Sequence, residues 1–172
     1  EIRTDAAGIK YWASHDTTTS GFKGTKAPRI YYDVEAQFSI NTKLGKTTLR
    51  GEYIFGQQSG TQKVSNSPRT LPSETSSYLR NFDGAYAYLI QRIGKTKHEI
   101  ALKYEWYDPN TDLSSKDFVV GTTMKDAEIR YDMLGVGYSY YWDENVKFML
   151  YYNMVRNEHA AGISGYNVDR SE

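Results

Sequence analysis

Charged and amide side chains occupy alternate positions in several stretches of this 172-residue chain, and their spacing raises the question of catalysis. Glu35 and Glu52 would lie opposite each other if the chain turned at Lys43-Leu44, and two facing carboxylates can act as general acid and base. Arg50 and Lys103 are expected nearby, so we interpret the carboxylates as members of ion pairs along an aqueous surface. Because no nucleophile motif such as G-x-S-x-G is present, we predict that the chain is not an enzyme.

Two short segments resemble the end of a phosphate-binding loop, G-x-x-x-x-G-K-[ST]. They are Gly45-Lys46-Thr47 and Gly94-Lys95-Thr96, but the positions of the required first glycine hold Ile40 and Leu89. Both segments are expected in hairpin turns between strands, where a phosphate-binding loop cannot form. We therefore predict no nucleotide site and no cofactor.

A third segment has the first ligand spacings of a calcium loop. Asp108, Asn110 and Asp112 alternate correctly, but Leu113 stands where the loop needs glycine and Val119 where it needs glutamate. Asx turn chemistry explains the segment without a metal. The three histidines are far apart in sequence, so they indicate no metal centre either; they are His15, His98 and His159.

These polar positions belong to stretches that alternate apolar and polar residues with a period of two. In the clearest stretch, 30–41, Ile30, Val34 and Phe38 fall on one side and the acidic residues on the other, a division that a helix would not keep. The pattern predicts seven antiparallel strands, at 8–15, 30–41, 47–57, 81–92, 98–106, 134–142 and 146–157.

In the stretch 81–92 we place Phe82, Gly84, Tyr86, Tyr88 and Ile90 on the apolar side, and Asn81, Asp83, Ala85 and Ala87 on the polar side, with Leu89 as the exception. The predicted polar side of all strands carries the candidate site residues. These are Asp33, Glu35, Arg50, Glu52, Asp83, Glu99, Lys103, Glu105, Lys147 and Asn153.

The connections between the strands alternate strictly between short and long. Tight turns are expected at 43–46, 94–97 and 143–145, and long polar loops at 15–29, 57–79 and 108–127. This rhythm is typical of outer-membrane barrels, whose tight turns face the periplasm and whose long loops face outside. We expect the loop 57–79 to fold into the pore or to lack fixed structure.

Aromatic residues on the predicted apolar side gather near the strand ends, and aliphatic residues lie between them. The loop side holds Tyr32, Tyr53, Phe55, Phe82, Tyr104 and Trp106, and the turn side holds Phe38, Tyr140, Trp142 and Phe148. Two such bands are typical of the two interfaces of a bilayer. The sequence therefore predicts an all-β, antiparallel, up-and-down transmembrane β-barrel with lipid against its apolar side.

Seven strands cannot close a barrel, because the two edges would leave backbone groups unpaired in hydrocarbon. We therefore expect residues 1–172 to be part of a single transmembrane β-barrel domain, lacking amino-terminal strands and the last strand. The chain has equal numbers of basic and acidic residues, 21 each, and no basic run, so nucleic acid is not expected as a partner.

The hairpin 134–153, LGVGYSYYWDENVKFMLYYN, resembles the penultimate hairpin of the phosphate-selective porin O and P family. Leu49-Arg50-Gly51-Glu52-Tyr53 and Phe82-Asp83-Gly84-Ala85-Tyr86 are similar to the same family, particularly its Bacteroidetes branch. The resemblance implies a 16-stranded, homotrimeric outer-membrane porin, of which this chain would form the carboxyl-terminal half.

Our first hypothesis is a water-filled channel for passive diffusion of small hydrophilic solutes or ions across the outer membrane, including anions such as phosphate. Acidic residues outnumber basic ones on the predicted inner side, which does not favour phosphate selectivity for this half. The alternatives are a soluble, ligand-binding up-and-down β-barrel with the faces reversed, and a barrel that serves as a structural or partner subunit of an envelope complex.

Overall fold

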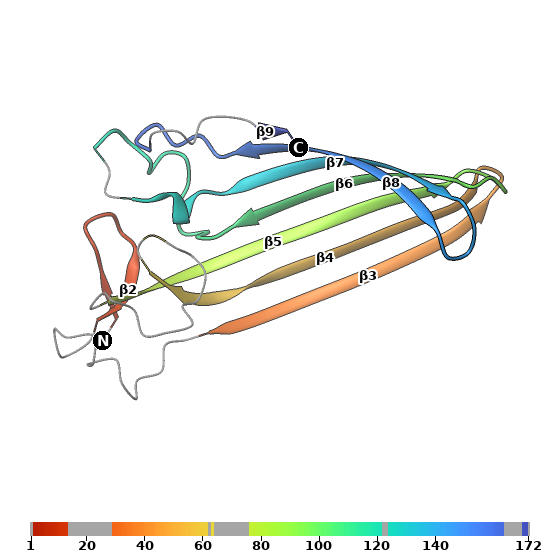
Figure 1. The fold of residues 1–172 in the computed structure, drawn as a ribbon. Coiled ribbons are helices and arrows are strands. Elements are labelled where there is room, and N and C mark those ends of the chain that lie inside the picture. The colour runs from red at the N-terminus through yellow and green to blue at the C-terminus, as the bar shows by residue number, and fades with distance from the viewer. Residues whose placement is uncertain are drawn as a thin grey trace.

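The computed structural model describes residues 2–13, 29–61, 63, 76–121, 124–163 and 170–171. All the strands in these ranges belong to one antiparallel sheet, and one turn of 3-10 helix, η2 (Asp126–Glu128), lies between two of them (Figure 1). The described residues contain no α-helix, and hence no helix that could cross a membrane.

Six long strands follow one another along the chain, and each pairs with the next. They are β3 (Ile30–Thr42), β4 (Gly45–Gly60), β5 (Ser76–Arg92), β6 (His98–Asp108), β7 (Tyr131–Tyr141) and β8 (Lys147–Asn157). The period-two stretches from 30 onward are therefore confirmed as strands in an up-and-down order.

The predicted first strand, 8–15, is confirmed only at its centre, because Gly8 and Ile9 precede the strand. The strand observed there is β2 (Lys10–Ala13), which pairs with β1 (Ile2–Thr4) in a hairpin and with the first residues of β5. Asp5 closes this hairpin, because its Oδ1 accepts hydrogen bonds from the backbone N–H of Ala7 and of Ile9, both at 2.9 Å. Ser14 and His15, the last two residues of the expected strand, and most of the loop after them lie outside the described residues.

The sheet is open at both sides. Among the described residues β3 pairs only with β4, and β8 pairs with β7 and, through Met154 and Val155, with the short β9 (Arg170–Ser171). The described strands therefore form an arc of sheet that does not close into a barrel (Figure 1).

Short and long connections alternate as predicted and lie at opposite ends of the strands (Figure 1). The backbone N–H of Gly94 donates to the carbonyl of Leu44 at 2.7 Å, and that of Tyr141 donates to the carbonyl of Lys97 at 2.8 Å, so the turns sit side by side. At the other end, β4 and β5 are paired as far as Gly60 and Tyr78. Both ends of the expected loop 57–79 are therefore part of these strands. Its centre lies outside the described residues.

The register between strands fixes which side chains share a face, because residues paired across an antiparallel sheet point the same way. The apolar face contains Ile30, Tyr32, Val34, Ala36, Phe38, Leu49, Gly51, Tyr53, Phe55, Asp83, Ala85, Ala87, Leu89, Ile100, Leu102, Tyr104, Trp106, Leu134, Val136, Tyr138, Tyr140, Phe148, Leu150, Tyr152 and Met154. The polar face contains the residues between them.

The two faces of β5 are the reverse of those predicted. Leu89 pairs with Leu49 of β4 and with Leu102 of β6, so the supposed exception belongs to the apolar face. Tyr86 pairs with Glu52 and lies on the polar face. Both alternate sets of β5 are largely apolar, so periodicity alone could not choose between them, and the neighbouring strands made the choice.

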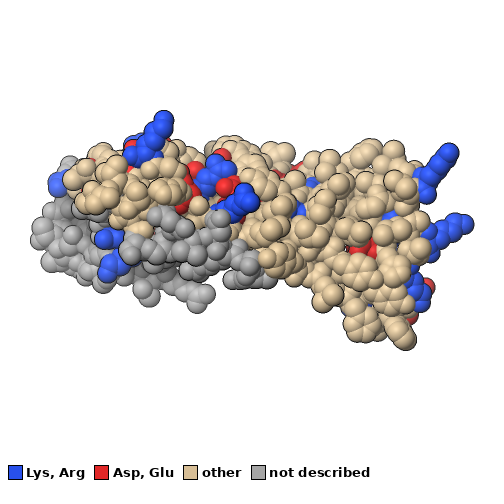
Figure 2. All heavy atoms as spheres, turned by 90° about the horizontal axis from the view of Figure 1, so that it is seen from above, with Lys and Arg blue, Asp and Glu red and all other residues tan. Residues whose placement is uncertain are grey.

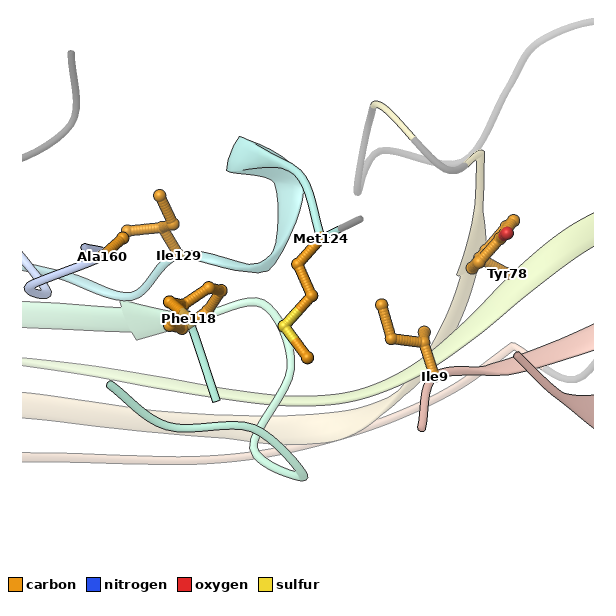
Figure 3. Close-up of a cluster of buried hydrophobic side chains, with 6 residues drawn as sticks. All are labelled: Ile9, Tyr78, Phe118, Met124, Ile129 and Ala160. Carbon is orange, nitrogen blue, oxygen red and sulfur yellow. The ribbon is translucent and has the colours of Figure 1, made fainter. Parts of the chain in front are cut away.

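A small core lies at the end of the strands that carries the long loops. Ile9, Tyr78, Phe118, Met124, Ile129 and Ala160 are buried together there, drawn from the first hairpin, β5 and the segments that follow β6 and β8 (Figure 3). These loops were predicted only to be polar, but they bury enough apolar surface to pack on one another as a cap.

Candidate functional site

The polar face concentrates its charge in two neighbouring rows that run across the strands. The acidic row contains Glu35, Glu52 and Glu105, with Tyr86 between them. The basic row, two residues nearer the turns, contains Arg50 and Lys103, with Gln37, Tyr88 and Asn153 in the same register. Successive rows on one face are about 7 Å apart along a strand.

Glu35 and Glu52 lie directly opposite each other, as predicted from the tight turn. Arg50 forms an ion pair with Glu35: its Nη2 is 2.8 Å from Glu35 Oε1, and its Nε donates to the same oxygen at 2.9 Å. The guanidinium also lies over the ring of Tyr86, with Cζ 5.7 Å from the ring centroid. Glu35 therefore belongs to an ion pair, in agreement with the interpretation, whereas Glu52 forms no ion pair among the described residues.

Lys103 forms the second ion pair of the two rows, with Glu105. Its Nζ also lies 5.6 Å from the centroid of Tyr88. The side chains of Lys103 and Glu105 are only 15% and 23% exposed, so both charged groups are largely shielded from solvent. Both basic groups of the rows thus have a carboxylate partner.

The remaining charged residues of the predicted set lie elsewhere on the polar face. Glu99 accepts a hydrogen bond from the hydroxyl of Tyr141 at 3.0 Å, and Lys147 lies over the ring of the same tyrosine, nearer the turns. Asp33 lies toward the loops, in register with Ile54. The predicted residues therefore spread along the polar face instead of converging on one point.

Asp83 does not lie with Glu52, and this part of the predicted site is wrong. It pairs with Phe55 on the apolar face, at the end of β5 nearer the loops, where its Oδ2 accepts a hydrogen bond from the hydroxyl of Tyr53 at 3.0 Å. The error follows from the reversed faces of β5. The same reversal moves Phe82 to the polar face, where its ring meets that of Tyr31.

Asn153 is on the polar face as predicted, in a tightly packed corner. The ring of Tyr151 lies over two glycines of β7: a Cβ on Gly135 would come 2.7 Å from Tyr151 Cε1, and one on Gly137 would come 2.6 Å from Cδ2. The hydroxyl of Tyr151 and Oδ1 of Asn153 are buried without a hydrogen-bond partner among the described residues.

The apolar face carries two aromatic bands. In the band nearer the loops, neighbouring rings are 5.4 to 6.5 Å apart from centroid to centroid, in the order Tyr32, Phe55, Tyr53, Trp106 and Tyr104. In the band nearer the turns, His98 packs against Tyr138 and Tyr140, and Tyr140 packs against Trp142; Phe38 and Phe148 lie at the same end of β3 and β8. Apart from Phe82, the predicted bands coincide with these residues.

Both bands cross the strands obliquely. The band nearer the loops starts at the paired Tyr32 and Phe55 and descends two rows to Tyr104. The band nearer the turns starts in the row of Phe38 and descends two rows to Tyr140. The two bands are parallel, because both descend by the same number of rows. In β3 they are about 20 Å apart along the strand, from Tyr32 to Phe38.

None of the metal or nucleotide motifs gains support from the described residues. Asp108 accepts a hydrogen bond from the backbone N–H of Asn110, whose side chain donates to Glu128, and Asp112 binds Asn81 instead. No three His, Cys, Asp or Glu side chains in the described ranges are grouped as a metal site would need. Gly94 lies in a hairpin turn, as predicted, and Gly45 is the first residue of β4, directly after the turn.

Sequence reasoning missed the tyrosines of the polar face. Tyr86 and Tyr88 were assigned to lipid, and Tyr107 and Tyr131 were not considered; their rings are 6.1 Å apart. Leu89 was the one local sign of the exchange, because it is a large apolar residue on the side assigned to water, but it was too weak to decide the facing by itself.

Sequence reasoning also missed a buried ion pair in the cap. Arg80 Nε lies 2.9 Å from both carboxylate oxygens of Glu128, and Asn110 Nδ2 donates to Oε2 at 2.8 Å. Arg80 and Glu128 are 0% and 1% exposed. These residues are 48 positions apart, so no local pattern indicates the pair.

Comparison with known proteins adds no relative: no protein-family model, no curated protein and no solved structure matches this chain.

Proposed function

We propose that this chain forms part of the wall of an outer-membrane channel through which small hydrophilic solutes diffuse passively. The apolar face contacts lipid in this proposal, and the polar face lines a water-filled lumen. The observation that carries it is the exposed apolar face, whose aromatic rings form two bands with aliphatic residues between them.

The exposure of that face supports lipid as its natural surroundings. Leu49, Leu102 and Val136 are 54%, 45% and 41% exposed, although each lies in a strand that is paired on both sides. An apolar surface that extends over six strands is far larger than a soluble monomer normally leaves in water. In the view of Figure 2, charged side chains lie at the right-hand end of the molecule and in a mixed group on the left half, and the surface between these two groups is largely uncharged.

The slope of the bands supports a tilted arrangement of the strands. Strands in membrane barrels are inclined by roughly 35–45° to the membrane normal, so a band that lies in the plane of an interface must cross them obliquely. A soluble barrel has no reason to segregate rings at two levels, because its interior is apolar throughout.

The polar face is the more enclosed of the two along β6 and β7. Lys103 and Glu105 are largely shielded and Gly135, Gly137 and Ser139 are buried, whereas Leu102, Val136 and Tyr138 are exposed. Side chains crowd on the inner side of a curved sheet and spread on the outer side. This distribution disfavours the soluble ligand-binding barrel, in which the apolar residues would be enclosed.

Closure of the proposed barrel needs further strands at the edges of the sheet. The outer edge of β3 pairs with no described residue, and β8 is paired on its outer side only at Met154 and Val155. Unpaired backbone groups cost several kcal/mol each in hydrocarbon, so a lipid-embedded sheet must have these edges paired. The homotrimer expected from the family resemblance stays a prediction.

Phosphate selectivity is not part of the proposal. Arg50 is paired with Glu35, and Lys103 with Glu105, so neither cation offers uncompensated charge to an anion. Charge pairs of this kind order water and small polar solutes instead.

The assignment of the faces can be tested with single cysteines, because the chain has none of its own. In the full-length protein reconstituted in vesicles, we expect a water-soluble maleimide to label Ala101→Cys and to spare its neighbour Leu102→Cys. The opposite labelling would refute the lipid-facing assignment.

The channel itself can be tested by planar-bilayer recording of the full-length protein. We expect stepwise, ohmic conductance in potassium chloride. If Ala101→Cys is labelled and Leu102→Cys is spared, but no conductance is seen at any voltage, the channel is refuted and a structural or partner role in the envelope is favoured.

A further inference from the structure

The polar face carries a path of tyrosine rings along the strands, and this path indicates what kind of solute the channel would carry. Toward the loops, the rings of Tyr31, Phe82, Tyr107 and Tyr131 follow one another with centroid distances of 5.2, 6.1 and 6.1 Å. This group covers β3, β5, β6 and β7 at the entrance of the proposed lumen.

The path continues toward the turns through β5 and β8. Tyr86 lies in the row below Tyr107, and its ring centroid is 5.6 Å from that of Tyr88. Tyr151 occupies the row below Tyr88, because it pairs with Gly137, which in turn pairs with Ala101. Rings therefore occur in successive rows, at intervals of about 7 Å along the strands.

Hydrogen-bonding groups flank the middle of this path. The Arg50–Glu35 pair lies beside Tyr86, and the Lys103–Glu105 pair lies beside Tyr88. These four side chains offer both donors and acceptors, and each cation is balanced by its carboxylate; Glu52, in the same acidic row, adds a further acceptor.

We propose that the tyrosine path, from Tyr31 and Phe82 to Tyr86, Tyr88 and Tyr151, guides neutral oligosaccharides through the lumen. This inference rests on the proposed channel and names its solute class. A pyranose ring has an apolar C–H face that packs on an aromatic ring, and its rim of hydroxyls matches the mixed donors and acceptors of the two ion pairs.

The structure favours a neutral solute over an anion or an apolar ligand. An anion would have to displace a carboxylate from Arg50 or Lys103. An apolar ligand would leave the charged groups of both rows desolvated and without compensation. A sugar avoids both costs, because its hydroxyls can bind the ion pairs without separating them.

Maltohexaose is a suitable probe, in planar-bilayer recordings of the full-length protein. We expect it to reduce the single-channel current in a saturable manner, and polyethylene glycol of similar mass to cause only non-saturable reduction by volume exclusion. In Tyr86→Ala/Tyr88→Ala we expect the half-blocking concentration to rise about a hundredfold, since each of the two aromatic stacking contacts contributes on the order of a factor of ten.

Matched variants separate stacking from general damage. Tyr86→Phe/Tyr88→Phe keeps both rings and should change the half-blocking concentration less than about twofold, and Tyr152→Ala removes an exposed ring of the apolar face and should not change it. If the double alanine variant does not insert, the single variant Tyr86→Leu provides the same comparison, with an intermediate shift expected.

Three results would overturn the inference. Ohmic conductance without block by maltohexaose, or with block no stronger than that by polyethylene glycol, would remove the sugar path and leave the channel intact. Block by inorganic phosphate at a lower concentration than by maltohexaose would indicate that the acidic and basic rows of the polar face bind anions instead of sugars. Absence of conductance in every variant would instead refute the channel and, with it, the inference.

Discussion

The two faces of β5 provide the most direct test of the structure, because adjacent residues of similar size and apolarity point in opposite directions. Leu89 pairs with Leu49 and Leu102 on the apolar face and is 44% exposed. Ile90 pairs with Thr48 and Ala101 on the polar face. Replacing each by arginine adds the same charge to the same strand, so a difference between the variants reports the facing alone.

The expected cost follows from depth in the membrane. An arginine on the lipid face costs roughly 2–4 kcal/mol at the bilayer midplane and about 0–1 kcal/mol near an interface. Leu89 is two residues, about 7 Å along the strand, from Gln91, whose amide binds the carbonyl of Leu44 in the turn region. We therefore expect Leu89→Arg to lower the free energy of unfolding by about 2 kcal/mol, or about 30-fold in the folding equilibrium.

For Ile90→Arg we expect a change within about 1 kcal/mol, because the guanidinium can reach water across the polar face. The measurement is reversible urea unfolding of the full-length protein in lipid vesicles, followed by tryptophan fluorescence. Leu89→Ala serves as a control for the loss of the leucine itself. A larger loss for Ile90→Arg than for Leu89→Arg would restore the faces predicted from periodicity and refute the register described above.

Three further changes test the charge network, the cap and the loop end of β6. Arg50→Ala removes the cation that neutralises Glu35, so the reversal potential in a potassium chloride gradient should shift toward potassium; an unchanged value would contradict the placement of this pair in the conducting path. Glu128→Gln keeps the shape but leaves the buried Arg80 without its counter-charge, and we expect about 3 kcal/mol less stability of the cap, measured as faster limited proteolysis in 109–130. Burial raises the pKa of Asp108, which lies beyond the loop-side aromatic band and outside the proposed membrane span, to about 6. Above pH 6 the buried carboxyl is ionised and destabilises the folded state, and this cost disappears as the pH falls toward 4 and the carboxyl binds a proton. Asp108→Asn should therefore stabilise the fold by about 1 kcal/mol at pH 7.5, after allowance for partial solvent screening, and should not change the stability near pH 4. An equal gain at both pH values would contradict the assignment.

The positions of the long strands and tight turns could be predicted from the sequence because they depend on neighbouring residues. Alternation with a period of two is visible wherever one side of a strand is charged and the other is not, as in β3 around Glu35. Pairing of Glu35 with Glu52 followed from the length of a single turn, since a tight hairpin fixes its own register.

The first predicted strand shows the limit of a weak local pattern. Its alternation extends over few residues, and only Lys10–Ala13 forms a strand, the short β2. Asp5 holds the hairpin that contains β2, and Ile9, just before β2, packs in the core under the loops. Long loops that bury a core at one end of the sheet were not foreseen, because Phe118, Met124 and Ala160 meet only in three dimensions.

The amino-acid sequence by itself determined that β5 is a strand, and only the tertiary structure decided which way its side chains face. Both alternate sets, with Leu89 in one and Ile90 in the other, are apolar enough to pass as the lipid side, so the choice came from pairing with β4 and β6. The buried pair of Arg80 and Glu128 was likewise decided by the fold, because desolvated charges stay buried only where distant segments bring them together.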